Sequence, residues 1–142
     1  MEQLTEHLEV KVCDFGSTCK LEKGALLEDG LGKGTTPYLA PEVLRQERYD
    51  HAIDVYSLGV MMWTLVTGRM PFDDIISSVG IIVAITGGDW FEFPFQCLDG
   101  SPLGPEVVML ISRCLDVQSK ARPSADELAI SLAHLKNTPT QE

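Results

Sequence analysis

The pattern of apolar and polar positions predicts a mainly helical chain with one short strand near its start. Residues 8–13 alternate between aliphatic and charged side chains, with Val10 and Val12 on the same side, as a strand with one buried face does. Residues 16–34 contain several glycines and mixed charges without a helical or strand period, which is typical of a long loop. The chain from residue 40 onward is predicted to be helical.

Three helical segments follow from this pattern. Ala40-Pro41-Glu42 opens a short helix expected to run to about residue 46, because proline is tolerated in the first turn. Residues 52–68 (AIDVYSLGVMMWTLVTG) carry apolar side chains around the whole circumference, which predicts a helix buried at the centre of a domain. Gly68 is its expected C-terminal cap. Residues 75–85 are predicted to form another helix, although Gly80 and a β-branched run weaken the pattern.

The last third predicts a loop and two more helices. Residues 86–105 are broken by glycine and proline and should form a loop, after which residues 105–115 are expected to be helical. Ser124 and Glu127 form a capping box that opens the last helix. Its predicted apolar face consists of Leu128, Ala129, Leu132 and Leu135. Residues 137–142 form a polar tail.

Charge and cysteine usage narrow the function classes. The 142 residues include 21 acidic and 11 basic side chains, a net charge of −10, which disfavours nucleic acid and anionic membrane surfaces as partners. No apolar run is long enough to span a bilayer. The first ten residues do not form a secretory signal, and the cysteines lack metal-site spacing, so they are expected to be reduced thiols. They are Cys13, Cys19, Cys97 and Cys114. We expect a cytoplasmic protein, with the nucleus as an alternative.

Four separated segments carry a family resemblance. They are VKVCDFG, GTTPYLAPEV, DVYSLGVMMWTLVTGRMPF and RCLDVQSKARPSADEL, in this order. Together they resemble the eukaryotic protein kinases of serine/threonine type, with a leaning toward the tyrosine-kinase-like group. The resemblance implies a partial C-lobe: a strand remnant and Asp-Phe-Gly turn over 1–16, an activation segment over 17–42, and a helical subdomain over 43–136. The N-lobe and the catalytic loop would be absent.

The resemblance implies a role for each residue of the Asp-Phe-Gly motif. Asp14 would hold magnesium against the nucleotide phosphates, since hard cations prefer oxygen ligands. Phe15 would pack under the cleft as a switch between active and inactive arrangements, and Gly16 completes the turn. The alternative interpretation is that Asp14 is a turn aspartate and Phe15 a packing residue.

The segment around Thr35 is implied to face the protein substrate. Thr35, Thr36 and Tyr38 lie in the part that resembles the end of the activation segment, and Thr35 matches the residue that marks serine/threonine specificity. Thr18, Thr35 and Thr36, with Ser17, are possible phosphorylation sites, which would require an arginine cluster to order the loop. A turn hydroxyl is the alternative role of Thr35.

Three further positions resemble architectural residues of the family. Ala40-Pro41-Glu42 matches the Ala-Pro-Glu motif, and Glu42 is expected to form a buried ion pair with Arg122. Asp54 resembles the carboxylate that bonds backbone N–H groups of the catalytic loop. The alternative is that Asp54 complements the dipole at its helix N-terminus.

Motifs that phosphoryl transfer requires are missing from these 142 residues. There is no glycine-rich loop, no Val-Ala-Ile-Lys strand and no His-Arg-Asp catalytic loop, all of which belong to a complete kinase. We therefore expect the chain alone to be inactive and to bind neither ATP nor Mg²⁺ tightly, although a complete parent enzyme would use both. We also expect residues 1–33 to be mobile. Protein substrates or other kinases are the expected partners. A non-catalytic binding module or decoy is the alternative, and an unrelated helical domain with chance matches a third.

Overall fold

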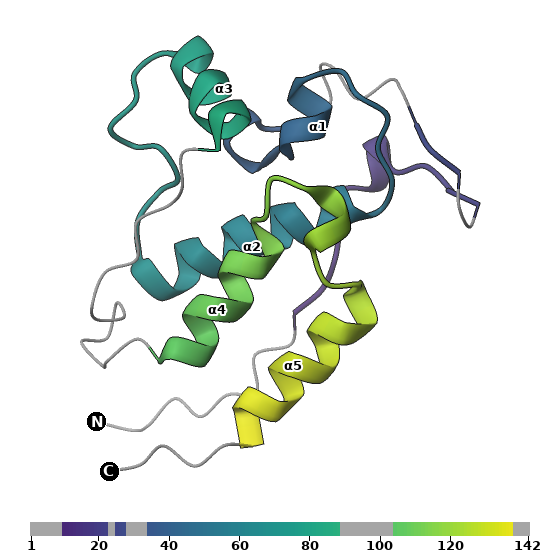
Figure 1. The fold of residues 1–142 in the computed structure, drawn as a ribbon, viewed down its shortest axis with the longest axis vertical. Coiled ribbons are helices and arrows are strands. Elements are labelled where there is room, and N and C mark those ends of the chain that lie inside the picture. The colour runs from purple at the N-terminus through teal and green to yellow at the C-terminus, as the bar shows by residue number, and fades with distance from the viewer. Residues whose placement is uncertain (1–9, 23–24, 28–33, 89–103, 138–142) are drawn as a thin grey trace.

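All helices and turns of regular structure in the described residues are of α or 3₁₀ type. The computed structural model describes residues 10–22, 25–27, 34–88 and 104–137, and these ranges form five α-helices and three short 3₁₀ turns (Figure 1). The helices are α1 (Pro41–Leu44), α2 (Ala52–Thr67), α3 (Ser78–Gly87), α4 (Pro105–Cys114) and α5 (Ala125–Asn137). The turns are η1 (Phe15–Ser17), η2 (Thr36–Tyr38) and η3 (Ser119–Ala121). The mainly helical class predicted from the sequence is confirmed.

Helix α2 is the centre of the packing. Helix α4 crosses it, while η2 and η3 also contact it (Figure 1). Gly59 lies at the crossing of α2 and α4, where an added Cβ would approach the Cβ of Cys114 to 2.7 Å. Only glycine allows so close an approach of the two helices, because cores are packed without spare space. The main core cluster joins α2 to α3 and α4 through Val60, Ile85 and Ile111.

The expectation that α2 is buried on every side is wrong for one face. Leu58, Met61 and Leu65 are exposed and recur at spacings of three and four residues, so they form one stripe along the helix. Asp54 continues this stripe toward the N-terminus of α2 and is also exposed. An apolar composition shows what a helix can bury, but burial needs a covering element. No described part of the chain covers this stripe.

The strand predicted over residues 8–13 is not present in its described part, residues 10–13. Val10 is 89% exposed and Val12 is 81% exposed, and Lys11 and Cys13 on the other side of the segment are exposed as well, so neither side is buried. A strand needs a neighbouring strand for its backbone hydrogen bonds, and the described residues contain no strand. The extended pairing found among the described residues is an isolated bridge between Leu27 and Tyr49, with N···O distances of 2.8 and 3.0 Å.

The helix boundaries follow the local signals with small shifts. Gly68 adopts a positive φ of 67° and its N–H donates to the Thr64 carbonyl at 2.9 Å, so the predicted cap of α2 is confirmed. Helix α1 ends at Leu44, two residues before the expected end. Helix α3 begins at Ser78 and ends at Gly87, so it starts and finishes later than predicted.

The capping box at the start of α5 is confirmed. The Ser124 N–H donates to Glu127 Oε2 at 2.7 Å, and the Glu127 N–H donates to Ser124 Oγ at 3.2 Å. The predicted apolar face is only partly buried: Leu128 is in the core, whereas Ala129 and Leu132 are exposed. Helix α5 packs on α4, and this contact covers a narrower stripe than the sequence indicates.

Some sequence predictions fall outside the described residues. These are the N-terminal part of the predicted strand, most of the loop at 86–105, Cys97, and the tail after residue 137. Within the described ranges, Cys13, Cys19 and Cys114 are free thiols. No helix among those ranges has the length and apolarity that crossing a membrane requires.

Candidate functional site

A buried ion pair joins two segments that are eighty residues apart in the sequence. The Arg122 guanidinium donates from Nη1 to Glu42 Oε1 at 2.7 Å and from Nη2 to Glu42 Oε2 at 2.8 Å. Glu42 is 6% exposed and Arg122 is 7% exposed. This is the bidentate geometry in which arginine and a carboxylate bind most strongly. The pair expected between these two residues is present in the structure.

The same guanidinium also holds two backbone carbonyls. Nε of Arg122 donates to the Asp116 carbonyl at 2.8 Å, and Nη1 donates to the Ala52 carbonyl at 3.1 Å. Its Cζ lies 5.0 Å from the centroid of the Tyr56 ring, within cation–π range. Burial raises the pKa of Tyr56 to about 12, an effect that the Arg122 charge opposes and the Glu42 charge reinforces. One arginine thus joins α1, the start of α2 and the turn after α4.

Prolines fix the backbone on both sides of this ion pair. Pro41 occupies the first turn of α1 and sets the start of the helix, where its missing N–H leaves no bond unmade. Glu42 follows it directly and faces the core. Arg122 is extended, with φ −69° and ψ 146°, because the following Pro123 disfavours the helical conformation at the preceding residue. Helix formation therefore resumes only at Ala125.

The segment at residues 34–39 is attached to α2 by a serine. Ser57 Oγ lies 2.8 Å from the Tyr38 carbonyl and 3.1 Å from the Ile53 carbonyl, so its hydroxyl holds η2 against the helix. Gly34 has φ 101°, and a Cβ there would lie 2.9 Å from Leu39 Cδ2. Both the left-handed backbone and the contact favour glycine at this position.

The two threonines of this segment have different environments. Thr35 is exposed and precedes η2, and its carbonyl accepts the Tyr38 N–H at 2.9 Å. Thr36 and Tyr38 are partly buried, and Tyr38 packs against the main core cluster. Of the two hydroxyls, the one on Thr35 is the more accessible to another molecule. Thr18 is exposed as well.

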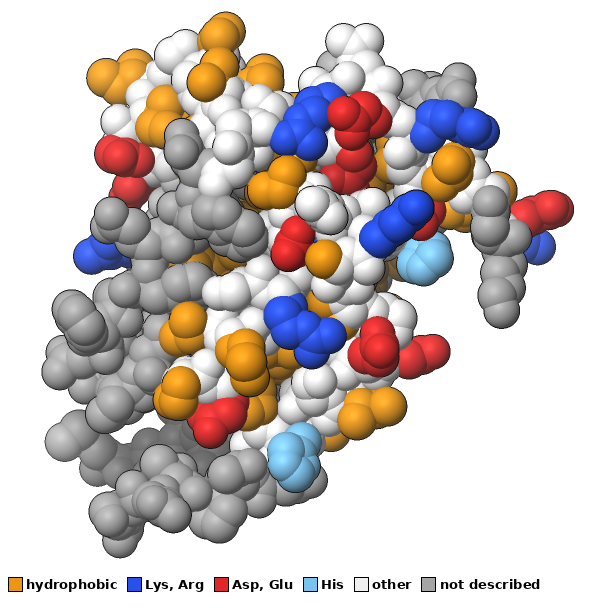
Figure 2. Space-filling model, in the orientation of Figure 1, with side chains coloured by type: hydrophobic (Ala, Val, Ile, Leu, Met, Phe, Trp, Pro, Cys, Tyr) orange, Lys and Arg blue, Asp and Glu red, His pale blue; other side chains and the backbone are white. Residues whose placement is uncertain are grey.

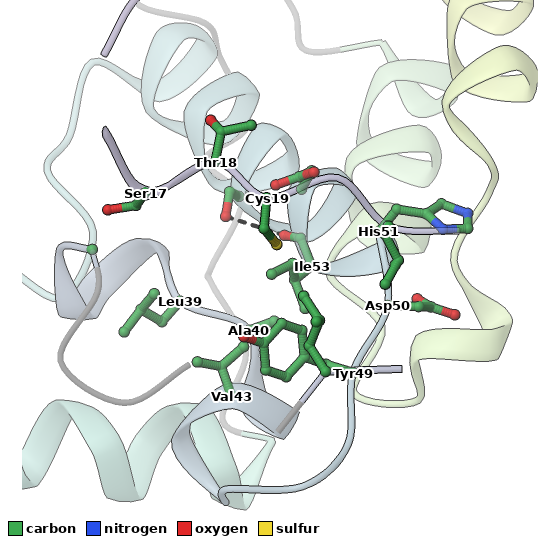
Figure 3. Close-up of a pocket in the computed structure, with 15 residues that line it drawn as sticks. Ser17, Thr18, Cys19, Leu39, Ala40, Val43, Tyr49, Asp50, His51 and Ile53 are labelled. Carbon is green, nitrogen blue, oxygen red and sulfur yellow. Dashed lines mark hydrogen bonds between the residues drawn. The ribbon is translucent and has the colours of Figure 1, made fainter. Parts of the chain in front are cut away.

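A cavity of about 350 Å³ separates residues 17–21 from the helical part of the chain. Its walls come from the segment at 34–40, the residues around Tyr49 and the N-terminal half of α2 (Figure 3). Tyr49, Val43 and Ile53 give it an apolar lining, and Asp54 adds a carboxylate. Figure 3 shows Thr18 and Cys19 on the extended segment that passes across the cavity. Asp54 and the residues that follow Gly16 therefore lie on the same cavity.

Asp14 and Phe15 lie on an open surface. Asp14 adopts a left-handed conformation, with φ 62° and ψ 64°, and its side chain is exposed. Phe15 is 64% exposed. No group of three or more His, Cys, Asp or Glu side chains suited to a metal ion occurs among the described residues. Magnesium requires near-octahedral oxygen coordination, and Asp14 by itself supplies one exposed carboxylate toward it.

Comparison with known proteins identifies the family. A protein-family model described as "Protein kinase domain" matches residues 3–131. The dual specificity protein kinase shkC of Dictyostelium discoideum is 32% identical over 92% of this chain, and the probable serine/threonine-protein kinase SIS8 of Arabidopsis thaliana is 36% identical over 92%. Human mitogen-activated protein kinase kinase kinase 7 is 29% identical over 89% of the chain.

The chain belongs to the protein kinase family, because the family match covers most of its length. Its homologues include serine/threonine kinases and kinases of the tyrosine-kinase-like group, as the four sequence motifs predict. The chain spans 25% of the Dictyostelium relative, 12% of the Arabidopsis relative and 19% of the human one. The chain therefore corresponds to only part of the length of each of these proteins.

The structure adds functional contacts that sequence reasoning missed. Ser57 binds the Tyr38 carbonyl, and Tyr56 lies against the Arg122 guanidinium. A lone serine within the apolar run of residues 52–68 was the available signal for the first contact. The second contact had no local signal, since a tyrosine in an apolar helix is typical of a core residue.

Proposed function

We propose that this chain forms the C-lobe part of a serine/threonine protein kinase domain, with the Asp-Phe-Gly turn within 1–16, the activation segment over 17–42 and the helical subdomain over 43–136. The observation that carries the proposal is the bidentate pair between Glu42 and Arg122. It joins two of the four motif segments inside a chain whose family match covers residues 3–131. The buried anchor would hold the end of the activation segment on the far helices.

The proposed roles of the other residues follow their positions in the motifs. Asp14 would contribute one carboxylate to Mg²⁺–ATP in a complete enzyme, and Phe15 and Gly16 would complete that turn. Thr35 would lie beside the acceptor hydroxyl, which its exposure next to η2 supports. Metal ions and positioning account for most of the catalysis in phosphoryl transfer. A single exposed carboxylate contributes little to metal binding or to positioning of the substrate.

The exposed stripe on α2 supports a role for sequence outside these 142 residues. Leu58, Met61 and Leu65 present apolar surface beside the Asp54 carboxylate, and full burial of such side chains contributes about 1.5 to 3 kcal/mol each. In our proposal the remaining part of a kinase domain covers this stripe and enters the adjoining cavity. That part would also supply the catalytic base and the phosphate-binding lysine.

The proposal is tested on the native polypeptide that contains these residues. Antibodies against residues 125–142 would recover it, and mass spectrometry would give its length and the sequence before residue 1. We expect His-Arg-Asp upstream, phosphotransfer to protein serine or threonine with Mg²⁺–ATP, and loss of that activity in Asp14→Ala. Phosphate on tyrosine alone, or activity unchanged by Asp14→Ala, would contradict the assignment.

The same experiment addresses the alternative predicted from the sequence. A native polypeptide limited to these residues, without phosphotransfer but with retained binding to a kinase or to a kinase substrate, would indicate a non-catalytic module. The intact Glu42–Arg122 anchor is compatible with that role, because it stabilises the helices independently of catalysis.

A further inference from the structure

Helix α3 has an unusual composition for a surface helix. Its sequence, SVGIIVAITG, contains no charged residue. One side packs on η2 and α1, and Ala84 and Ile85 are buried there. A surface helix normally carries charged or polar side chains on its opposite side. Helix α3 carries apolar side chains both on its packed side and on its outer side.

The outer side of α3 forms an apolar surface, which we call the α3 face. It consists of Val79 and Val83 on the helix, exposed by 68% and 62%, and of Ile76, which lies two residues before the helix begins and is 105% exposed. Val79 and Val83 are four residues apart and therefore lie on one side of α3. Figure 2 shows hydrophobic side chains gathered over α3 at the upper left. At Gly87 a Cβ would have no atom within 4 Å, so the C-terminal end of the helix also has open space beside it.

Helix stability does not explain these residues. Valine, isoleucine and glycine are poorer helix formers than alanine, lysine or glutamate, by up to about 1 kcal/mol per residue. Exposed positions that served only the helix would favour the second group. Contiguous exposed apolar residues of this kind mark interaction sites. The residues of the α3 face are therefore better suited to binding than to holding the helix together.

Charges at the rim indicate the chemistry of the partner. Asp73 and Asp74 are exposed and lie two and three residues before Ile76. At the other end of α3, the Arg45 side chain donates to the Thr86 carbonyl. The rim near Ile76 therefore includes two adjacent carboxylates, in a chain with a net charge of −10. Electrostatic complementarity favours a partner with lysine or arginine at the matching position.

We propose that the α3 face binds one amphipathic helix of a partner protein, with aliphatic side chains facing Val79 and Val83 and a basic residue facing Asp73 and Asp74. Exposed apolar side chains at i and i+4 on α3 form a ridge of the kind along which a second helix packs. The proposal concerns a surface distinct from the cavity beside Asp54, and it does not depend on phosphotransfer.

A second copy of the chain is a poorer occupant. The α3 face consists of three side chains, whereas stable protein pairs bury about 800 Å² from roughly 20 to 30 residues on each partner. A two-fold pair would use the same patch on both copies. It would also bring together two chains that each carry a net charge of −10, whose like charges repel.

The test uses a designed helical peptide of leucine and lysine as the probe, with a leucine–glutamate peptide as its charge-reversed counterpart. Binding to the 142-residue chain would be measured by fluorescence anisotropy and mapped by NMR chemical-shift changes. We expect the lysine peptide to bind, with the largest shifts over residues 73–87, and the glutamate peptide to bind at least tenfold more weakly. Val79→Glu/Val83→Glu should weaken binding of the lysine peptide at least tenfold.

The matched control is Met109→Glu/Ile130→Glu, which makes the same kind of change at exposed positions of α4 and α5. Both double variants add two negative charges, so nonspecific attraction would strengthen lysine-peptide binding to each equally. Weakening by the α3 variant alone would support the proposal. Equal effects of the two variants, or shifts centred outside residues 73–87, would overturn it. If the α3 variant fails to fold, the chemical-shift map of the lysine peptide on the unmodified chain still shows whether the peptide binds at residues 73–87.

Discussion

Removal of the Arg122 guanidinium should destabilise the fold more than any other single loss of charge. Arg122→Met leaves the Glu42 carboxylate buried without its partner and removes the donor from the Asp116 and Ala52 carbonyls. An uncompensated buried charge of this kind costs about 3 to 5 kcal/mol. Whole domains are stable by only about 5 to 15 kcal/mol, so the variant should be marginally folded.

Urea denaturation followed by far-ultraviolet circular dichroism measures this loss. The midpoint should fall in Arg122→Met without a change in the denaturant slope, because the surface exposed on unfolding is unchanged. Arg113→Met is the matched control, since Arg113 is an exposed arginine on α4, and surface changes of this kind usually stay within about 0.5 kcal/mol. Equal effects of the two substitutions would refute the reasoning.

A double-mutant cycle separates the ion pair from the shape of the side chains. In Glu42→Leu/Arg122→Met both buried charges are removed together, which is far less costly than leaving one of them. The double variant should therefore be more stable than Arg122→Met, with a coupling of about 0.5 to 3 kcal/mol between the two sites. A double variant no more stable than Arg122→Met would show that the lost carbonyl bonds, and not the buried charge, dominate the cost of removing Arg122.

Three further predictions concern other parts of the fold. Gly59→Ala places a Cβ against Cys114 and should lower the free energy of unfolding by about 1 to 3 kcal/mol in urea titrations. Gly87→Ala is the control, because a Cβ there meets no atom; it should be neutral or stabilising by up to about 1 kcal/mol. Equal losses in the two variants would contradict the packing of α2 on α4. Hydrogen bonds from Ser124 lower the pKa of Glu127. The stability that ionised Glu127 contributes is therefore present above the pKa of unfolded glutamate and lost as the pH falls through the folded value. NMR titration of Ser124→Ala should show the pKa of Glu127 rising only partway, because the substitution removes the hydroxyl donor and keeps the backbone N–H. Burial raises the pKa of Cys114 to about 11, so iodoacetamide near neutral pH should label the Cys114 thiol only after urea is added. Rapid labelling of Cys114 in the native chain would contradict its burial between α2 and α4.

Local sequence signals predicted the helices well because their causes are local. The cap at Gly68 depends on one backbone conformation, and the box at Ser124 and Glu127 depends on atoms three residues apart. The Glu42–Arg122 pair has no such local cause. It was predicted through the family resemblance, because periodicity cannot show that residues eighty positions apart meet.

The predictions that failed concern burial, which depends on neighbours. Alternation at Val10 and Val12 indicates a strand, but the described residues contain no strand to pair with it. The apolar circumference of α2 similarly predicted burial of Leu58 and Met61, which are exposed. In both cases the sequence shows which surfaces favour burial, while the available neighbours determine whether burial occurs.

Phosphotransfer by the purified 142-residue chain tests the central proposal most directly. The chain would be incubated with radiolabelled ATP, Mg²⁺ and a mixed protein substrate, beside Asp14→Ala prepared in the same way. We predict equal background incorporation in both samples, because the sequence contains no His-Arg-Asp loop and no phosphate-binding lysine strand. Incorporation above that background that is lost in Asp14→Ala would contradict the account, since it would show a complete phosphotransfer site within these residues.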